Sequence, residues 1–295
     1  MTSDSWDTAG KGGERAAPRQ YETVRRGDAS EGSCRQRDQA AGEYASASSH
    51  TPEAAAAQGF ESSYDSIAGL YDPWSRSVTE DVDFYIAEAR KAGRPVVELG
   101  VGTGRIAVPT AEAGVPVIGV DSSERMLDVC RARAEEAGVG ELVDLRPGDL
   151  RHPPVNERVA LVTCPFRGLL HLESDEERLE ALRAVRGLLL PGGRFVFDVF
   201  APSRDDVLET HGRWLEREPG IWERADWDTN RRVLTLSVRG EAGETRMYLA
   251  WRSPEEWRHL LERAGLEVVA CYGWFDLRPY DGGEDSVWIA RRPTD

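Results

Sequence analysis

Short apolar runs alternate with segments of helical periodicity over the middle of the chain. The apolar runs predict strands at residues 95–99, 115–120, 142–145, 159–164 and 194–200, the last after a turn at 191–193. Apolar side chains that recur every three or four positions predict helices at residues 106–113, 123–137 and 176–190. Strands that alternate with helices of this length indicate βαβ units, whose right-handed crossovers build a parallel sheet.

Two further helices are predicted before the first strand. Tyr64 and Tyr71 fall on one face of a short helix that Pro73 interrupts, and a second helix is predicted over residues 77–92. Upstream, residues 1–58 are rich in Ala, Gly, Ser, Glu and Arg and contain almost no Ile, Leu or Val. Such a segment buries too little apolar surface to offset the entropy of ordering, so it is predicted to be a disordered tail.

After residue 200 the pattern changes to alternating stretches joined by turn residues. Three strands are predicted at 222–228, 232–239 and 245–252, within an antiparallel insert at about 212–252. A capped helix at 254–264 and strands at 266–272 and 286–290 follow. The sequence therefore predicts one α/β domain over residues 59–293. It comprises a seven-strand, mostly parallel sheet with helices on both faces, the antiparallel β-insert and an N-terminal helical cover.

Composition and charge limit which partners are expected and in which cellular compartment the protein is expected. The chain carries 37 Lys and Arg against 52 Asp and Glu, a formal net charge of −15, and an acidic surface repels the phosphates of nucleic acid. The sequence has no apolar run long enough to span a membrane and no apolar leader. Its four cysteines are far apart and form no metal or disulfide motif, which predicts a cytoplasmic protein without a metal site. Neither nucleic acid nor a membrane is expected as a partner.

A glycine-rich turn follows the first predicted strand. Gly100, Gly102 and Gly104 allow a ligand to approach the backbone, and the next helix begins with free N–H groups. The dinucleotide fingerprint GxGxxG requires glycine where this chain has Arg105, whose charge either lies near a cofactor carboxylate or is solvated. Glu98 is ionisable within a buried strand, which indicates either a function or an ordinary strand-end carboxylate.

Three more loops fall at the same predicted edge of the sheet. Asp121 ends the second strand, where its carboxylate suits the two hydroxyls of a ribose, although it is also a possible helix N-cap. Asp149 follows the third strand, where it could accept a hydrogen bond from an adenine amine or form a turn with Gly148. Phe166 follows the fourth strand. Because the carboxyl ends of parallel strands meet at one edge, these residues predict a slot for an adenosine with a zwitterionic tail.

These segments together resemble the class I S-adenosylmethionine-dependent methyltransferases over roughly residues 60–293. The matching motifs are VVELGVGTGR, VIGVDSSERML, LRPGDL, ALVTCPFRGLLHL and LLPGGRFVFDVF. The resemblance implies a Rossmann-like sheet, S-adenosylmethionine as the cofactor, and in-line methyl transfer to a nitrogen or oxygen nucleophile of a small molecule. The insert is similar to the small sheet of sugar N-methyltransferases and glycine N-methyltransferase-like enzymes.

The resemblance also implies roles at the methionine end of the cofactor. Glu98, Gly100 and Gly102 would shape the methionine pocket. Members of the family that begin with a similar YDxxAxxYD segment use it to cover the cofactor, so Tyr64 and Tyr71 are candidates for this cover.

A second set of implied roles belongs to the adenosine end and the substrate passage. Asp121 would hold the ribose, and Met126 would pack on the adenine, although a methionine at this spacing is equally typical of a core. Asp149 would meet the adenine amine, aided by the N–H of Leu150, and Phe166 would line the passage to the substrate.

His171 and the tryptophans leave their roles open. His171 is a candidate catalytic base, but a single histidine in an apolar run is also typical of a hydrogen-bonded core residue. Seven of the nine tryptophans lie in the last third of the chain, where they form either the core of the insert or an aromatic wall for a substrate. Two other functions stay open at this stage, a nicotinamide-dependent oxidoreductase and a non-catalytic binding protein. The oligomeric state is also open.

Overall fold

The computed structural model describes residues 68–75, 77–93, 95–241 and 243–294, which belong to one compact unit. The predicted tail at 1–58 and the candidate residue Tyr64 lie outside the described residues. None of the helices in the described ranges is both long enough and apolar enough to cross a membrane. The same ranges contain no cluster of His, Cys, Asp or Glu arranged to bind a metal ion.

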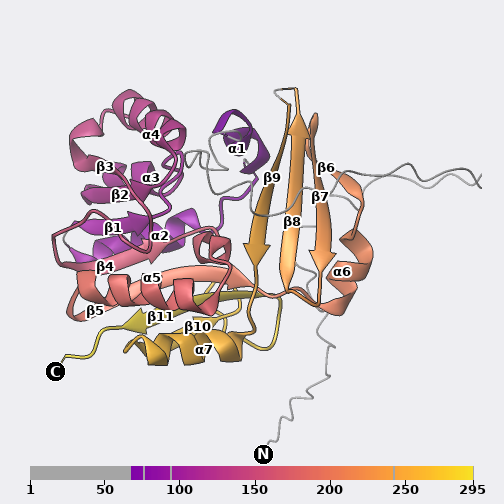
Figure 1. Ribbon diagram of the computed structural model, residues 1–295. Coiled ribbons are helices and arrows are strands. Elements are labelled where there is room, and N and C mark those ends of the chain that lie inside the picture. The colour runs from indigo at the N-terminus through magenta and orange to yellow at the C-terminus, as the bar shows by residue number, and fades with distance from the viewer. Residues whose placement is uncertain (1–67, 76, 94, 242, 295) are drawn as a thin grey trace, which may run out of the picture. The chain divides into compact units, whose positions relative to one another are not determined.

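A seven-stranded sheet is the larger of the two sheets in the described unit (Figure 1), with the strand order β10-β11-β5-β4-β1-β2-β3. Its strands are β1 (Val96–Leu99), β2 (Val117–Asp121), β3 (Val143–Pro147), β4 (Val159–Cys164), β5 (Leu189–Phe200), β10 (Glu267–Tyr272) and β11 (Asp285–Arg291). Only β11 runs against the others, because it pairs antiparallel with both β5 and β10. The prediction of a mostly parallel, seven-strand sheet is confirmed, and the carboxyl ends of β1, β2, β3 and β4 meet at one edge.

Helices cover both faces of this sheet, as predicted. The helices are α2 (Val82–Ala92), α3 (Ala107–Glu112), α4 (Glu124–Glu136), α5 (Asp175–Leu188) and α7 (Pro254–Arg263). α2 packs on α3 and β4, and α3 also packs on α4, which forms one layer. α5 and α7 pack on each other over β4, β5 and β10 on the other side. Their apolar faces are fully buried at residues such as Leu182 and Trp257, which are 0% exposed.

The insert forms a separate antiparallel sheet of four strands, where the sequence predicted three. They are β6 (Trp214–Glu218), β7 (Ile221–Asp228), β8 (Val233–Gly240) and β9 (Gly243–Ala250), paired in that order. β6 and the short helix α6 (Arg204–Thr210) were not predicted, because α6 spans only seven residues and β6 is a short strand without clear alternation. Four of the seven C-terminal tryptophans are buried in the core, namely Trp227, Trp251, Trp257 and Trp288.

Two predicted boundaries near the N-terminus are wrong. α2 begins at Val82 rather than at residue 77, and its cap residue Asp81 makes no cap bond because its carboxylate pairs with Arg105. Helix α1 (Ala68–Ser75) continues through Pro73 instead of stopping there. Pro73 removes only the hydrogen bond to the carbonyl of Gly69, an exposed residue at the helix start where water can replace it.

The predicted turn at residues 191–193 is also wrong, because this segment belongs to β5. The N–H of Gly192 donates to the carbonyl of Arg292, and the N–H of Arg292 donates to the carbonyl of Gly193, both at 2.9 Å. The C-terminal segment therefore holds these residues in an extended conformation. An irregular register between β4 and β5 at Val159 and Leu161 accommodates the extra length.

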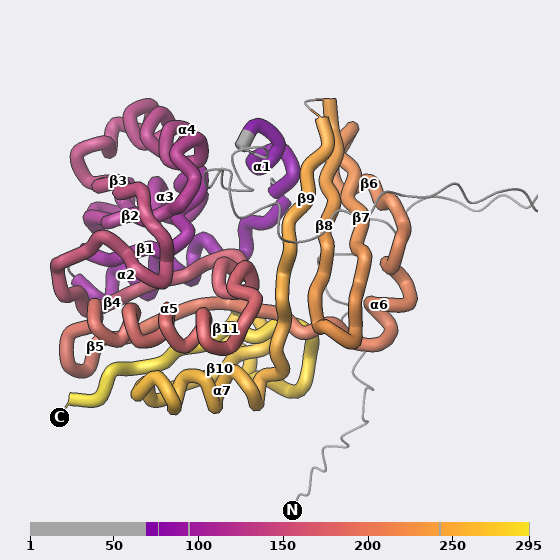
Figure 2. The backbone as a smooth tube through the Cα atoms, in the orientation of Figure 1, coloured from indigo at the N-terminus to yellow at the C-terminus, as the bar shows by residue number. Residues whose placement is uncertain are grey.

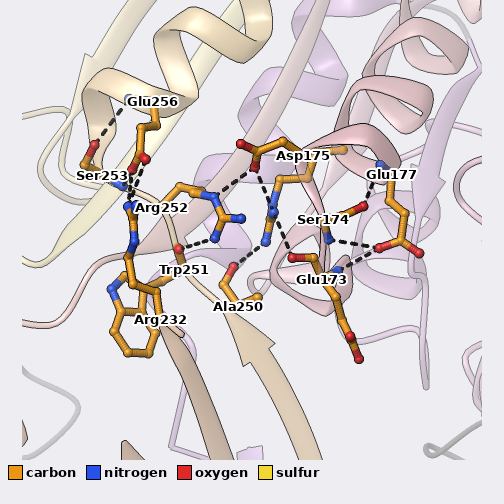
Figure 3. Close-up of polar contacts among 11 residues, drawn as sticks. Glu173, Ser174, Asp175, Glu177, Arg232, Ala250, Trp251, Arg252, Ser253 and Glu256 are labelled. Carbon is orange, nitrogen blue, oxygen red and sulfur yellow. Dashed lines mark hydrogen bonds and ion pairs between the residues drawn. The ribbon is translucent and has the colours of Figure 1, made fainter. Parts of the chain in front are cut away.

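A polar junction joins the antiparallel sheet to the parallel one (Figure 3). Arg178 of α5 is 0% exposed and donates to the carbonyl of Ala250 at the end of β9, at 2.6 Å. Asp175 accepts from Arg178 at 3.1 Å and from Arg252 at 2.8 Å. Capping boxes built on Ser174 and Ser253 begin α5 and α7, and they lie on either side of this junction. The start of α5 and the end of β9 are therefore held together.

Candidate active site

The glycine-rich turn after β1 presents its backbone to open space. Gly100 has a φ of 70° and Gly102 a φ of 55°, and a Cβ added at either would meet nothing within 4 Å. Gly104 is needed for a different reason, since its Cβ would lie 2.5 Å from the Sγ of Cys130 in α4. Only the first two glycines leave room for a ligand along the chain, whereas the third allows helix packing.

Asp121, at the end of β2, is tied to this turn. Its carboxylate accepts a hydrogen bond from the N–H of Gly102 at 2.9 Å and another from the N–H of Ser123 at 2.9 Å. The N-cap of α4 is Ser123, whose side chain accepts from the N–H of Met126, so the alternative of Asp121 as the cap is wrong. A carboxylate has about four acceptor positions, so Asp121 can also accept from a ligand hydroxyl.

A cavity of about 410 Å³ opens at this edge of the sheet. It brings together nine of the twelve predicted site residues, which are Tyr71, Gly100, Gly102, Asp121, Met126, Asp149, Leu150, Phe166 and His171. Its wall also includes Glu173, Glu177 and Tyr248, which the sequence did not single out. Glu98 and Arg105 are not part of the wall, and Tyr64 lies outside the described residues. Among the described residues that line this wall there is no tryptophan, so the C-terminal tryptophans do not supply the aromatic surface considered from sequence, and the insert contributes Tyr248.

Glu98 lies in β1 directly before the glycine turn and is only 3% exposed. Burial raises the pKa of its carboxyl group to about 8, although the positive charge of Arg105 opposes this shift. Glu98 is therefore mostly neutral at pH 7 in the protein alone. A cationic ligand group placed beside it would favour the ionised form.

Arg105 supports the wall of the cavity from behind. Its guanidinium forms two hydrogen bonds to the carboxylate of Asp81, at 2.7 and 2.6 Å, and one to the carbonyl of Val78 at 3.2 Å. The same group lies 4.7 Å from the ring centre of Phe166, in the geometry of a cation–π contact. Arg105 thus links the start of α2 to the cavity wall, and a role toward a cofactor carboxylate stays a prediction.

Asp149 belongs to a charged network at the far end of the cavity. Arg151 donates to its carboxylate at 2.5 to 3.1 Å through the guanidinium, and this bonding lowers the pKa of Asp149. Arg151 also donates to Glu177 at 2.7 Å. No signal in the sequence pointed to Arg151 or Glu177, because their contacts join the loop after β3 to the start of α5.

Three aromatic rings pack against one another beside the cavity, and two of them, Tyr71 and Phe166, line it. Phe166 lies 6.1 Å from Tyr71 and 5.8 Å from Trp74, both edge-on, and Tyr71 lies 6.0 Å from Trp74. Trp74 donates from Nε1 to Glu223 of β7 at 2.9 Å. The sequence predicted that Tyr71 helps to cover the cofactor, but it did not predict Trp74. The only available signal for Trp74 was its position one helical turn after Tyr71.

Helix α1 carries two of these rings and is fixed on both sides. Its Asp72 accepts from the hydroxyl of Thr103 in the glycine turn at 2.6 Å and pairs with Arg133 of α4. The chain path in Figure 2 shows α1 beside α4 and the antiparallel strands, and contacts to α4, β6 and β8 confirm this position. The helical cover predicted from sequence therefore bridges the two sheets.

His171 lies in the 3₁₀ helix η4 (Gly168–His171) and faces the cavity. Burial lowers its pKa to about 4, although a hydrogen bond with the backbone of Tyr248 in β9 opposes the shift. His171 is therefore neutral at physiological pH. Through this bond the antiparallel sheet contributes to the cavity next to the residues at the tips of the parallel strands.

The cavity lies at the carboxyl edge of a parallel sheet and is surrounded by a glycine turn, an acidic strand end and an acidic loop. These features define an α/β enzyme that binds a nucleoside-containing cofactor. A family model described as a methyltransferase domain matches residues 96–193. The CcbJ methyltransferase of Streptomyces caelestis is 32% identical, with a TM-score of 0.69 over 78% of this chain and 98% of that one. The chain thus belongs to the class I S-adenosylmethionine-dependent methyltransferases.

Two further relatives carry descriptive names. The cypemycin N-terminal methyltransferase of a Streptomyces species is 26% identical over 226 residues, which cover 74% of this chain and 89% of that protein. CalS10, an amino pentose methyltransferase of Micromonospora echinaspora solved with S-adenosylmethionine bound, has a TM-score of 0.52 and 22% identity over 84% of this chain and 100% of that one. The fold, the cofactor and the enzyme class predicted from sequence are confirmed, and a nicotinamide-dependent oxidoreductase is excluded.

Proposed function

We propose that this methyltransferase acts on a nitrogen or oxygen nucleophile of a small molecule that enters the cavity from the side of η4 and β9. The observation that supports this is the single cavity itself, which joins Gly100, Asp121 and Asp149 at the strand tips to His171 and Tyr248 on the other side. A cofactor held at the strand tips would leave the second half of the same cavity for the acceptor.

The residues of the strand tips suit the cofactor. The open space over Gly100 and Gly102 accommodates its methionine end, and Glu98 beneath them provides a carboxyl group that can become negative beside a cation. Asp121 offers acceptor positions for the ribose, and Met126, which is 1% exposed, provides an apolar surface for the adenine. When bound, the cofactor supplies a methyl carbon made electrophilic by a sulfonium.

Adenine recognition is proposed for the loop after β3. Asp149 carries a carboxylate at the wall of the cavity, held there by Arg151, and the N–H of Leu150 follows it. A carboxylate that accepts from an exocyclic amine beside an N–H that donates to a ring nitrogen matches the edge of adenine. Phe166 is proposed to separate the cofactor from the acceptor, and Tyr71 to cover both.

The charge of the cavity favours an amine as the acceptor. Glu173, Glu177 and Asp149 line it, and Arg151 is the one Lys or Arg among the described lining residues; its guanidinium bonds two of these carboxylates. A net negative wall attracts an ammonium group and repels a carboxylate or phosphate. The name of one relative, the cypemycin N-terminal methyltransferase, agrees with this choice.

His171 orients the acceptor in this proposal. An oxygen nucleophile needs a base that removes its proton during transfer, and a histidine with a pKa of about 4 is a weak base. An amine can lose its proton to solvent before it attacks, and neutral His171 can then accept a hydrogen bond from it. The weak basicity of His171 is a second reason to prefer nitrogen over oxygen.

The cofactor site is tested by replacing Asp121. Asp121→Ala is expected to weaken S-adenosylmethionine binding by about tenfold to a hundredfold, because hydrogen bonds to a charged group contribute roughly 1.5 to 3 kcal/mol. Isothermal titration calorimetry measures this change directly. Asp144→Ala, on the exposed side of β3, is the matched control and should bind like the natural protein. Unchanged affinity in Asp121→Ala would remove the ribose assignment.

The acceptor class is tested separately by transfer of labelled methyl groups from S-adenosylmethionine. Paired panels of small amines and alcohols with the same carbon skeleton distinguish nitrogen from oxygen. We expect label in the amines, and label confined to the alcohols would contradict the amine assignment while leaving the cofactor site intact.

A further inference from the structure

The loop after β4 contains two consecutive residues in a left-handed conformation. Phe166 has a φ of 52° and Arg167 a φ of 65°, and neither is glycine. This conformation costs an L-residue roughly 1 to 2 kcal/mol, so it persists only where surrounding contacts stabilise it. The strained pair lies at the cavity, because Phe166 forms part of its aromatic side.

One buried carboxylate accepts hydrogen bonds from both strained residues. Asp198 of β5 is 8% exposed, and its Oδ1 accepts from the N–H of Phe166 at 2.8 Å. Its Oδ2 accepts from the N–H of Arg167 at 3.1 Å. A left-handed turn points two successive N–H groups at one anion, whereas an extended loop cannot do so.

The carboxylate itself is held in place. The hydroxyl of Tyr85 in α2 donates to Asp198 Oδ1 at 2.7 Å, and Tyr85 is only 1% exposed. On the other side, the guanidinium of Arg167 pairs with Asp285 of β11 at 2.6 Å and lies over the ring of Phe200 at 4.6 Å. α2, near the start of the domain, and β11, near its end, therefore both hold this two-residue turn in place.

We propose that Asp198 is a positioning residue for methyl transfer: its carboxylate stabilises the left-handed Phe166–Arg167 turn and so sets the place of the Phe166 ring between cofactor and acceptor. Asp198 does not line the cavity and acts through the backbone of the turn. This proposal rests on the cofactor occupying the cavity described above. Its chemical basis is that a carboxylate can accept from two N–H groups and a hydroxyl at once, which the amide of asparagine cannot.

The first test measures hydrogen exchange of the Phe166 and Arg167 amides by NMR. Asp198→Asn keeps the size of the side chain but replaces one acceptor oxygen by an NH₂ group, so at least one amide loses its partner. We expect exchange at this turn to accelerate at least tenfold relative to the natural protein. Asp226→Asn, in β7 of the other sheet, is the matched control and should leave both amides unchanged.

The second test separates the backbone role from a general loss of stability. Arg167→Gly and Arg167→Ala both remove the contacts with Asp285 and Phe200, but only glycine adopts a positive φ without strain. In combination with Asp198→Asn, the glycine variant should bind S-adenosylmethionine about fivefold more tightly than the alanine variant. Calorimetry gives the affinities, and near-ultraviolet circular dichroism verifies folding.

Equal affinities in the glycine and alanine combinations, or unchanged exchange in Asp198→Asn, would overturn the proposal. If Asp198→Asn does not fold, the single variants Arg167→Gly and Arg167→Ala still decide, because strain at the turn predicts the tighter binding for glycine. If the natural protein fails to bind S-adenosylmethionine, the cofactor placement is wrong, while amide exchange continues to test the turn itself.

Discussion

Two buried carboxyl groups on the central strands show how single residues are tuned. Glu98 in β1 and Asp198 in β5 both have pKa values raised by burial, to about 8 and about 6. Tyr85 and the turn amides offset part of the burial cost at Asp198, so its shift is the smaller one. At Glu98 the partly opposing charge is that of Arg105. Glu98 is thus the group whose proton responds most to a cationic ligand near neutral pH.

We expect S-adenosylmethionine binding at pH 7 to release roughly one proton from Glu98, because the positive ligand favours the ionised carboxylate. Affinity should rise with pH and level off above about 8. Titration calorimetry in buffers of different ionisation enthalpy counts the proton. Glu98→Gln should abolish the release, whereas Glu124→Gln, at an exposed position, should keep it. Release that survives in Glu98→Gln would assign the proton to another group.

The same pKa fixes the sign of a stability effect. Since the folded-state pKa of Glu98 lies above its ordinary value of 4.5, its neutral form adds stability fully below pH 4.5. That stability is lost progressively as the pH rises from about 4.5 to about 8, so unfolding free energies of the ligand-free protein should fall over this range more steeply than those of Glu98→Gln and level off above it.

At the scale of elements, α1 is the helix whose position changes most readily. It is a helix of eight residues that includes a proline, and its position depends on contacts to other elements. Asp72 joins it to the glycine turn and α4, and Trp74 joins it to β7. Leu70 and Trp74 of this helix are also buried in the core, so apolar packing adds to the polar contacts. A short helix beside a cavity that is held only by its side chains has the properties of a cover that can open.

We expect Asp72→Asn to speed dissociation of S-adenosylmethionine by about five- to tenfold, because the cover loses its charged partner for Arg133. The melting temperature should change little, since about a third of each side chain in this pair is exposed. Stopped-flow fluorescence measures the rate. Asp83→Asn, at an exposed position in α2, is the control. An unchanged dissociation rate would show that α1 does not limit release of the cofactor.

At the scale of the molecule, the active site depends on two sheets being held together. Arg178 is buried at their junction, and its Nε has no hydrogen-bond partner among the described residues. Its other nitrogens bond Asp175 and the carbonyl of Ala250. The cavity wall at Glu173 and Glu177 lies at the start of the same helix, so this junction also fixes the acceptor side of the site.

Arg178→Met is expected to lower the free energy of unfolding by roughly 2 kcal/mol, because the buried carbonyl of Ala250 loses its donor while methionine fills most of the volume. For a domain of this size the melting temperature should fall by about 6 °C. Differential scanning calorimetry tests this. Arg183→Met, at an exposed position of α5, should melt like the natural protein. An equal loss in both variants would mean that the junction adds no stability of its own.

The order of elements and most of the cofactor site could be predicted from the sequence because both depend on residues that are close together along the chain. Hydrophobic periodicity gave the seven strands of the main sheet, and a parallel sheet brings the ends of its strands to one edge whatever the side chains are. Gly100, Asp121 and Asp149 each lie at or just after the end of a strand, so their meeting in one cavity follows from topology alone.

Tertiary structure decided the partners that lie far apart along the chain. Asp198 bonds a turn 32 positions earlier, and Trp74 bonds Glu223 across 149 positions. The partner of Arg105 is Asp81, which occupies the N-cap position of α2 but makes no cap bond. Such pairs are set by the register of strands and the packing of helices, since these bring donors and acceptors within about 3 Å of each other. Periodicity along the chain does not determine that register, so the sequence does not predict the pairs.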